Sequence, residues 1–214
     1  PIMALRLDLK IAIPLVIVPS IVSNLVVMLQ AGRFREAINR FWPLYLASIP
    51  GLLIGLTILV SIDADLARAI LGLVLITYAA WALRNRFFSL SGEWERALKI
   101  PAGFCTGFVN GLTGSQVMPV LPYLLSLDLN KSAFIQAINI SFTLSSLVML
   151  VGMNRLGHLS LNTFLTALGG LVPVLLTVYL AGRLQGRLTG AIHRTLVLTF
   201  LLVMGLVLLV KTFF

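Results

Sequence analysis

The residues of this chain whose types and spacing suit chemistry are uncharged hydrogen-bond donors within an interrupted hydrophobic segment. Residues 103–127 read GFCTGFVNGLTGSQVMPVLPYLLSL, with four glycines, two prolines and no charged residue. Glycine and proline interrupt helices, and inside a bilayer a broken backbone persists only where protein or water satisfies its polar groups. Backbone N–H groups freed at a break favour anions. We therefore expect an anion site at Gly111–Gln116, with side-chain donors from Thr113, Ser115 and Gln116.

A polar stripe follows this segment and predicts the facing wall of the site. Its members are spaced by 4, 3, 4 and 3 residues, which places them on one helical face: Ser132, Gln136, Asn139, Thr143 and Ser146. Amides and hydroxyls at membrane depth need partners, so the stripe should face inward. Hydrogen bonding between helices would also explain it. The adjacent glycine break favours a solute pathway lined by Gln136, Asn139 and Thr143. Ser20 and Asn24 supply some polarity in the first half.

The elements that position these residues are membrane helices. Of the 214 residues 59% are hydrophobic and only 11% are charged, and the mean hydropathy is +1.03. A soluble domain carries about 25% charged residues. Apart from the interrupted segment, six apolar runs are long enough to span a bilayer: 11–31, 42–60, 66–83, 132–152, 161–181 and 191–210. The composition predicts an all-α, polytopic integral membrane protein of the cell (inner or plasma) membrane.

The chain reads as two homologous repeats, which we place at residues 1–98 and 99–214. LRLDLK at Leu5–Lys10 recurs as LSLDLN at Leu125–Asn130, and NLVVML at Asn24–Leu29 matches SSLVML at Ser145–Leu150. Transporters are often built from such repeats. The second copy opens with the glycine-rich segment, whereas nothing precedes Pro1. The duplication therefore predicts a further broken segment of roughly twenty residues ahead of Pro1, missing from this sequence.

The basic residues favour one orientation of the two repeats. If the glycine-rich segment re-enters its own side, the side containing Arg33 and Arg84 holds 11 of the 16 lysines and arginines; if the segment crosses, that side holds 9. Cytoplasmic loops are enriched in these residues. The count favours a re-entrant segment, three crossings per half and inverted halves, with the Arg33 and Arg84 loops in the cytoplasm.

Several classes of function find little support in the sequence. The net charge of +9 comes from residues in loops and at helix ends, which indicates membrane topology rather than nucleic-acid binding. Cys105 is the sole cysteine, so cysteine offers neither a disulfide nor a metal site. His158 and His193 have no neighbouring carboxylate, and the common catalytic motifs are absent. We expect no enzyme activity, no metal and no cofactor.

Two stretches carry a resemblance to a known family. The stretch GFVNGLTGSQVMPVLPYLLSLDLNKSAFIQAINISFTLSSL resembles the second repeat of the sulfite exporter TauE/SafE family. The first half, from PIMALRLDLK to RFREAINRFWPLYLASIPGLLIG, resembles the first repeat without its opening helix. The resemblance implies a permease of two four-segment repeats for sulfite, sulfonates, other organosulfur compounds or organic anions. By motif match, the glycine-rich turn beside its translocation path is formed by Gly111, Thr113, Gly114 and Pro119.

One departure from the family pattern bears on the substrate. Many relatives continue with glycines where this chain has Ser115, Gln116 and Val117, and Gln116 could donate to a ligand larger than sulfite.

The expected partners are a small anionic solute and the lipid bilayer, and the sequence leaves homo-oligomerisation open. We expect export by alternating access, because a negative interior drives anions outward. Two alternatives remain at this point. One is a non-transporting membrane scaffold or assembly factor, and the other is a cation permease, which the lack of buried acids disfavours.

Overall fold

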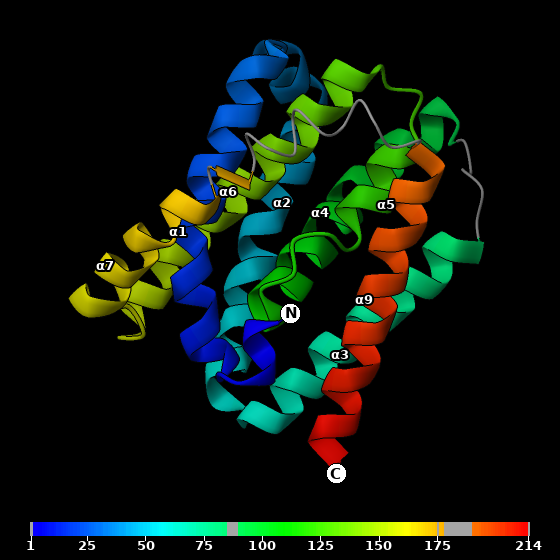
Figure 1. Ribbon diagram of the computed structural model, residues 1–214. Coiled ribbons are helices and arrows are strands. Elements are labelled where there is room, and N and C mark those ends of the chain that lie inside the picture. The colour runs from blue at the N-terminus through cyan, green and yellow to red at the C-terminus, as the bar shows by residue number, and fades with distance from the viewer. Residues whose placement is uncertain (1, 85–89, 175, 178–189, 214) are drawn as a thin grey trace.

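The computed structural model describes residues 2–84, 90–174, 176–177 and 190–213, and every regular element in these ranges is a helix (Figure 1). A short 3₁₀ helix, η1 (Met3–Leu5), comes first. The α-helices are α1 (Leu9–Ala31), α2 (Phe34–Ser61), α3 (Ala64–Arg84), α4 (Gly92–Thr113), α5 (Val120–Leu125), α6 (Lys131–Arg155), α7 (Leu161–Gly169) and α9 (Gly190–Phe213). The expected all-helical fold is confirmed for these ranges.

Four of these helices, α1, α2, α3 and α6, are long and apolar enough to cross a membrane. Shorter apolar helical stretches cover Leu161–Val174 and Leu198–Thr212. Each of these six overlaps one of the apolar runs that the sequence predicts as spans, although α2 begins eight residues before the run 42–60. The predicted run 161–181 extends into residues that lie outside the described ranges.

Hydrogen bonds between helix ends define two ends of the bundle. At the Arg33 end, the Ser132 hydroxyl donates to the carbonyl oxygen of Ala31 at 2.6 Å, which joins the end of α1 to the start of α6. At the opposite, Asp8 end, Lys10 Nζ donates to the carbonyl oxygens of Val60 and Ile62 and so satisfies the last turn of α2. Helices α1 and α2 are therefore antiparallel, and α6 runs parallel to α2.

Glycines hold α2 and α4 in direct backbone contact. A Cβ added at Gly103, Gly107 or Gly111 of α4 would overlap the carbonyl oxygen of Leu44, Ser48 or Leu52 in α2, respectively. Gly51 and Gly55 of α2 stand in the same relation to the backbone of α4. Small residues at four-residue spacing allow such close approach in membranes. Because contacts advance along both helices in the same direction, α2 and α4 are parallel.

The segment that contains α4 and α5 is a hairpin that returns to its starting end. The backbone N–H of Leu90, just before α4, donates to the carbonyl oxygen of Ser126, just after α5, at 2.9 Å. The Tyr123 hydroxyl of α5 donates to the carbonyl oxygen of Glu95 in the first turns of α4 at 2.9 Å. Both ends of the segment therefore lie at the Arg33 end, and the chain between α4 and α5 forms the inner tip.

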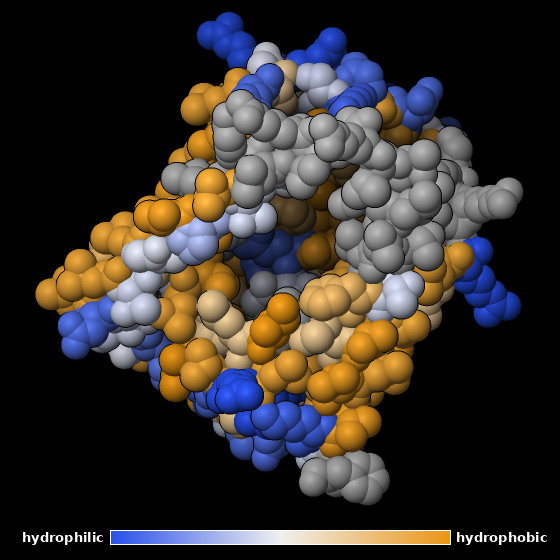
Figure 2. All heavy atoms as spheres, in the orientation of Figure 1, coloured by the Kyte–Doolittle hydropathy of each residue, from blue (hydrophilic) through white to orange (hydrophobic). Residues whose placement is uncertain are grey.

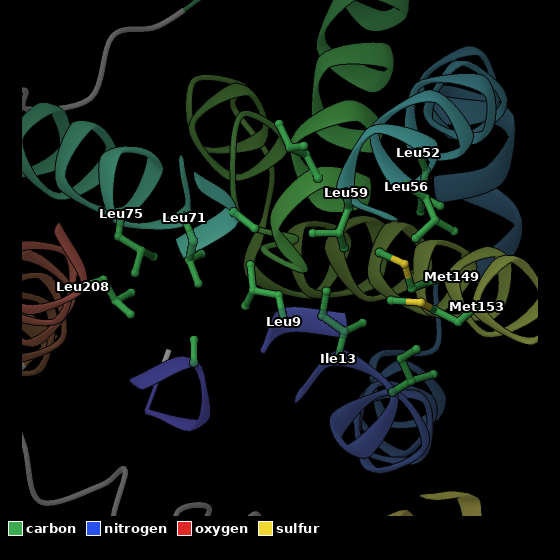
Figure 3. Packing of buried hydrophobic residues seen from close by; sticks show 14 residues of the cluster. Leu9, Ile13, Leu52, Leu56, Leu59, Leu71, Leu75, Met149, Met153 and Leu208 are labelled. Carbon is green, nitrogen blue, oxygen red and sulfur yellow. The ribbon is translucent and has the colours of Figure 1, made fainter. Parts of the chain in front are cut away.

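The remaining helices surround this hairpin. Helix α6 packs on α1 and α2, and α9 packs antiparallel to α3, with Gly72 and Gly205 at their closest approach. One apolar cluster joins all of these helices near the Asp8 end; it includes Leu9, Ile13, Leu56, Leu71, Met149 and Leu208 (Figure 3). The cluster includes Leu112 of α4, near the tip of the hairpin.

Candidate functional site: a cavity at the tip of the broken hairpin

A cavity of about 460 Å³ lies where the hairpin tip faces α1 and α6. Its polar lining residues are Ser20, Asn24, Asn110, Thr113, Ser115, Gln116 and Ser146. Its apolar lining comes mainly from α1 and α3, with Leu9, Ile13, Ile17, Leu71 and Leu75 among its members. Figure 2 shows a hollow with hydrophilic residues inside and hydrophobic residues along its lower rim. The cavity therefore has one polar wall and one apolar wall.

The break in the hairpin begins later than the sequence suggests. Helix α4 continues through Thr113, and Gly114 ends it with φ 71°, a left-handed conformation that glycine adopts without strain. The prediction that the break covers Gly111–Gln116 is therefore wrong for Gly111 to Thr113, which are still helical. Gly111 lies within α4 and faces Leu52 of α2, because close packing between the helices outweighs the helix-breaking tendency of its glycines.

The backbone around Gly114 is partly satisfied by the chain itself. The Gly114 N–H donates to the carbonyl oxygen of Asn110 at 2.7 Å, and the Ser115 N–H donates to Thr113 Oγ1 at 3.2 Å. The N–H groups of Gln116 and Val117 have no hydrogen-bond partner among the described residues. The end of α4 at the cavity is a C-terminus, whose partial negative charge does not attract an anion. Binding at this tip must therefore depend on side-chain donors and the two later N–H groups.

Gln116 connects the break to α6. Its Nε2 donates to Ser146 Oγ at 2.7 Å, and both residues line the cavity. Because Ser146 Oγ accepts this bond, its own O–H proton remains available to a ligand. Ser146 is the one member of the sequence-predicted stripe that reaches the cavity wall.

Asn110 is a cavity residue that the sequence analysis did not single out. It is buried, with 1% of its surface exposed, and its Nδ2 has no hydrogen-bond partner among the described residues. An unpaired buried amide costs about 1–3 kcal/mol, which a polar ligand would recover. An amide side chain in a charge-free apolar run could have indicated a functional residue. The glycine pattern instead favoured the residues that follow Asn110 as the site.

Ser20 and Asn24 lie on the α1 side of the cavity, as does the methyl-rich surface of Ile13 and Ile17. Asn24 Nδ2 donates weakly to Ser20 Oγ, at 3.4 Å. Pro14 and Pro19 are buried within α1, and Gly170 approaches Pro19 from the α7 side. The polarity of the first half therefore sits opposite the hairpin tip.

The other sequence-predicted site residues lie outside the cavity lining. Gln136 Oε1 accepts from the Arg33 N–H at 3.3 Å, while its Nε2 is unpartnered within the described ranges. Asn139 Nδ2 donates to the carbonyl oxygen of Ile135 in its own helix, and the buried Thr143 hydroxyl has no partner in the described part of the chain. Pro119 follows a cis peptide bond and precedes α5. The stripe thus divides, with Ser146 at the cavity and Gln136, Asn139 and Thr143 buried closer to the Arg33 end.

In the part of the chain that the structure describes, the charged residues lie at the two ends of the bundle, and none of them lines the cavity. At the Arg33 end, Arg40 makes two hydrogen bonds of 2.8 Å to the Glu95 carboxylate, and Lys99 Nζ lies 3.5 Å from it. Glu95 belongs to the polar first turns of α4, outside the membrane-spanning helices. The hydrogen bonds from Arg40 hold the pKa of this carboxyl below its usual value, against the opposing effect of burial.

Comparison with known proteins identifies one family. The family model described as Sulfite exporter TauE/SafE matches residues 1–208, nearly the whole chain. No curated protein and no solved structure matches the chain.

Proposed function

Because the chain belongs to the sulfite exporter TauE/SafE family, we propose that it moves small sulfur-containing or organic anions outward through the cavity at the hairpin tip. The members of this family are membrane transporters rather than enzymes, and this supports a transport function for the multi-pass helical chain. The observation that carries the proposal is the polar wall formed by Asn110, Gln116 and Ser146, which lies beside a broken backbone in the middle of the bundle. Discontinuous helices are the usual place for a transporter's substrate site.

The proposed translocation path continues from Ser146 along α6. Thr143, Asn139 and Gln136 follow one another toward the Arg33 end, each buried, and Thr143 and Gln136 carry unpartnered polar atoms among the described residues. Unpaired polar groups at membrane depth are costly unless another conformation gives them partners. We assign this stripe to the part of the path that is closed in this conformation and opens in another, as alternating access requires.

The distribution of charge supports an orientation with the Arg33 end in the cytoplasm. Described basic residues at this end include Arg33, Arg35, Arg40, Arg84, Arg96, Lys99 and Lys131. Lysines and arginines concentrate on the cytoplasmic side of membrane proteins. In this orientation the Asp8 end faces outward, and substrate would leave the cavity toward it.

Solute flux in proteoliposomes under an imposed membrane potential tests the proposal. The probes are sulfite, thiosulfate, sulfoacetate, taurine and a simple carboxylate, each measured also with the double variant Gly114→Leu, Asn139→Leu. Saturable, voltage-dependent flux that the double variant lacks would support transport and rank the substrates. Full transport by a correctly inserted double variant would overturn the assigned site. No flux for any probe would favour a non-transporting scaffold.

A further inference from the structure

We propose that the cavity selects singly charged oxyanions over doubly charged ones, with the Asn110 amide as the central donor. This inference rests on the proposed function, because it specifies the charge of the anion that the same cavity accepts. The polar groups of the cavity wall are amides and hydroxyls, and no lysine, arginine or histidine is among the described residues that line it.

The donors that can reach a ligand are few and neutral. Asn110 Nδ2 carries two N–H groups without a partner in the described part of the chain. The Ser146 hydroxyl accepts from Gln116, which leaves its proton free and leaves the second Nε2 proton of Gln116 free as well. These donors match the oxygens of a sulfonate or hydrogen sulfite group, which accept hydrogen bonds and carry one shared negative charge.

Neutral donors are adequate for one charge and poor for two. The cost of moving an ion from water into a weakly polar interior rises with the square of its charge, whereas donor number stays fixed. The apolar wall of Leu9, Ile13 and Ile17 keeps the surroundings weakly polar. The C-terminus of α4 adds partial negative charge beside the ligand, and this repulsion doubles for a dianion.

For sulfite, this selectivity favours one protonation state. Hydrogen sulfite and sulfite coexist near neutral pH, and only the former is singly charged. The transported species would be hydrogen sulfite, so flux at fixed total sulfite should fall as the pH rises. The proton travels as part of the anion, and no ionisable residue has to carry it.

Proteoliposome flux of fixed-charge probes tests this without any substitution. Methanesulfonate is singly charged and sulfate doubly charged over the whole range from pH 6 to pH 8. We expect constant methanesulfonate flux over this range, at least about tenfold lower sulfate flux, and sulfite flux that follows the hydrogen sulfite fraction. Equal flux of sulfate and methanesulfonate, or sulfite flux that rises with pH, would overturn the inference. If methanesulfonate flux also fell with rising pH, a separately bound proton would be involved and the inference would be wrong.

Asn110→Asp tests the central donor, because it keeps the shape of the side chain and replaces the N–H donors with a negative charge. We expect at least about tenfold loss of methanesulfonate flux, and partial retention in Asn110→Ser, which keeps one donor. The matched control is Asn154→Asp on exposed surface of α6, which should leave flux unchanged. Unchanged flux in Asn110→Asp would remove Asn110 from the site. Absence of flux for every anion with the unsubstituted protein would instead count against the proposed function itself.

Discussion

Gln116 Nε2 lies 2.7 Å from Ser146 Oγ, and this hydrogen bond joins the non-helical tip of the hairpin to α6 across the sequence. Both residues line the cavity, so the bond positions the donor wall as well as the backbone after Gly114. Removing the donor would leave Ser146 without this partner and would allow the tip to move away from α6.

We therefore expect Gln116→Leu to lower anion flux by about fivefold, the equivalent of one neutral hydrogen bond. The measurement is the initial rate of methanesulfonate flux, normalised to correctly inserted protein. Gln30→Leu is the matched control, because Gln30 is exposed near the end of α1 and outside the cavity lining. A Gln116→Leu protein as active as this control would show that the bond does not position the site.

Gly114 should tolerate substitution much less well than another glycine of the same backbone conformation. Gly114 and Gly32 have φ angles of 71° and 73°, so any side chain is strained at both. An added Cβ at Gly114 would lie 2.8 Å from Ile13 Cγ1, whereas nothing lies within 4 Å at Gly32. We expect Gly114→Ala to reduce flux severely and Gly32→Ala to reduce it little. Similar flux in the two variants would mean that the contact with Ile13 is unimportant.

The interface between α2 and α4 gives a prediction about stability. A methyl group at Gly107 would overlap the backbone of Ser48, and neither helix backbone can move aside without separating from the other. We expect Gly107→Ala to lower the free energy of unfolding by about 3 kcal/mol. Gly92→Ala, in the same helix with open space around it, should be neutral or slightly stabilising. Thermal unfolding in detergent measures both, and equal Tm values would contradict the packing argument.

The ion pair of Arg40 and Glu95 predicts a dependence of stability on pH. Hydrogen bonds from Arg40 lower the pKa of Glu95 in the folded protein, so the unfolded chain takes up this proton more readily. The stabilisation is fully present above the usual carboxyl pKa and is lost as the pH falls through the lowered value. Glu95→Gln should therefore show a smaller fall in Tm on acidification than the unsubstituted protein.

Glu36→Gln is the control for this effect. Glu36 also pairs with an arginine, Arg33, but both side chains are about half exposed, and such surface pairs contribute little. Its acid-dependent loss of Tm should match that of the unsubstituted protein. If Glu95→Gln behaved in the same way as Glu36→Gln, the Arg40 pair would not stabilise the fold.

The re-entrant path of the hairpin can be tested by labelling. Cys105 is the sole cysteine of the chain, so Cys105→Ser provides a background without thiols. Single cysteines at Ser91 and Asp128, both exposed and on either side of the hairpin, should react with an impermeant reagent from the same face of the membrane. A cysteine at Ser61, exposed at the end of α2, should react from the other face. Reaction of positions 91 and 128 from opposite faces would show that the segment crosses.

The sequence predicted the helical class and the six apolar stretches well, because long apolar runs have few alternatives to helix in a bilayer. It was less reliable inside the hairpin. Four-residue glycine spacing marks both flexible backbone and close helix packing, and only the partner helix distinguishes them. Gly111 therefore packs against Leu52, while Gly114 ends α4.

The cavity shows the same limit of sequence reasoning. Ser20, Asn24, Thr113, Gly114, Ser115 and Gln116 line it and were all singled out from the sequence. Gln136, Asn139 and Thr143 share a helical face with Ser146, but the pattern does not reveal how far along that face the cavity extends. Asn110 could be recognised as a site residue only from the structure. Its amide is buried without a hydrogen-bond partner among the described residues, and no repeated spacing in the sequence marks it.

The glycine contacts of α2 and α4 also limit where this protein can bend. Between Gly103 and Gly111 of α4 the two backbones touch directly at the glycines, which leaves no room for the helices to slide past one another. We therefore expect α2 and α4 to move as one rigid unit, which the hydrogen bonds between Arg40 and Glu95 also join at the Arg33 end. Any hinge is then expected beyond Thr113, where Gly114 ends α4 and the chain continues into the non-helical tip.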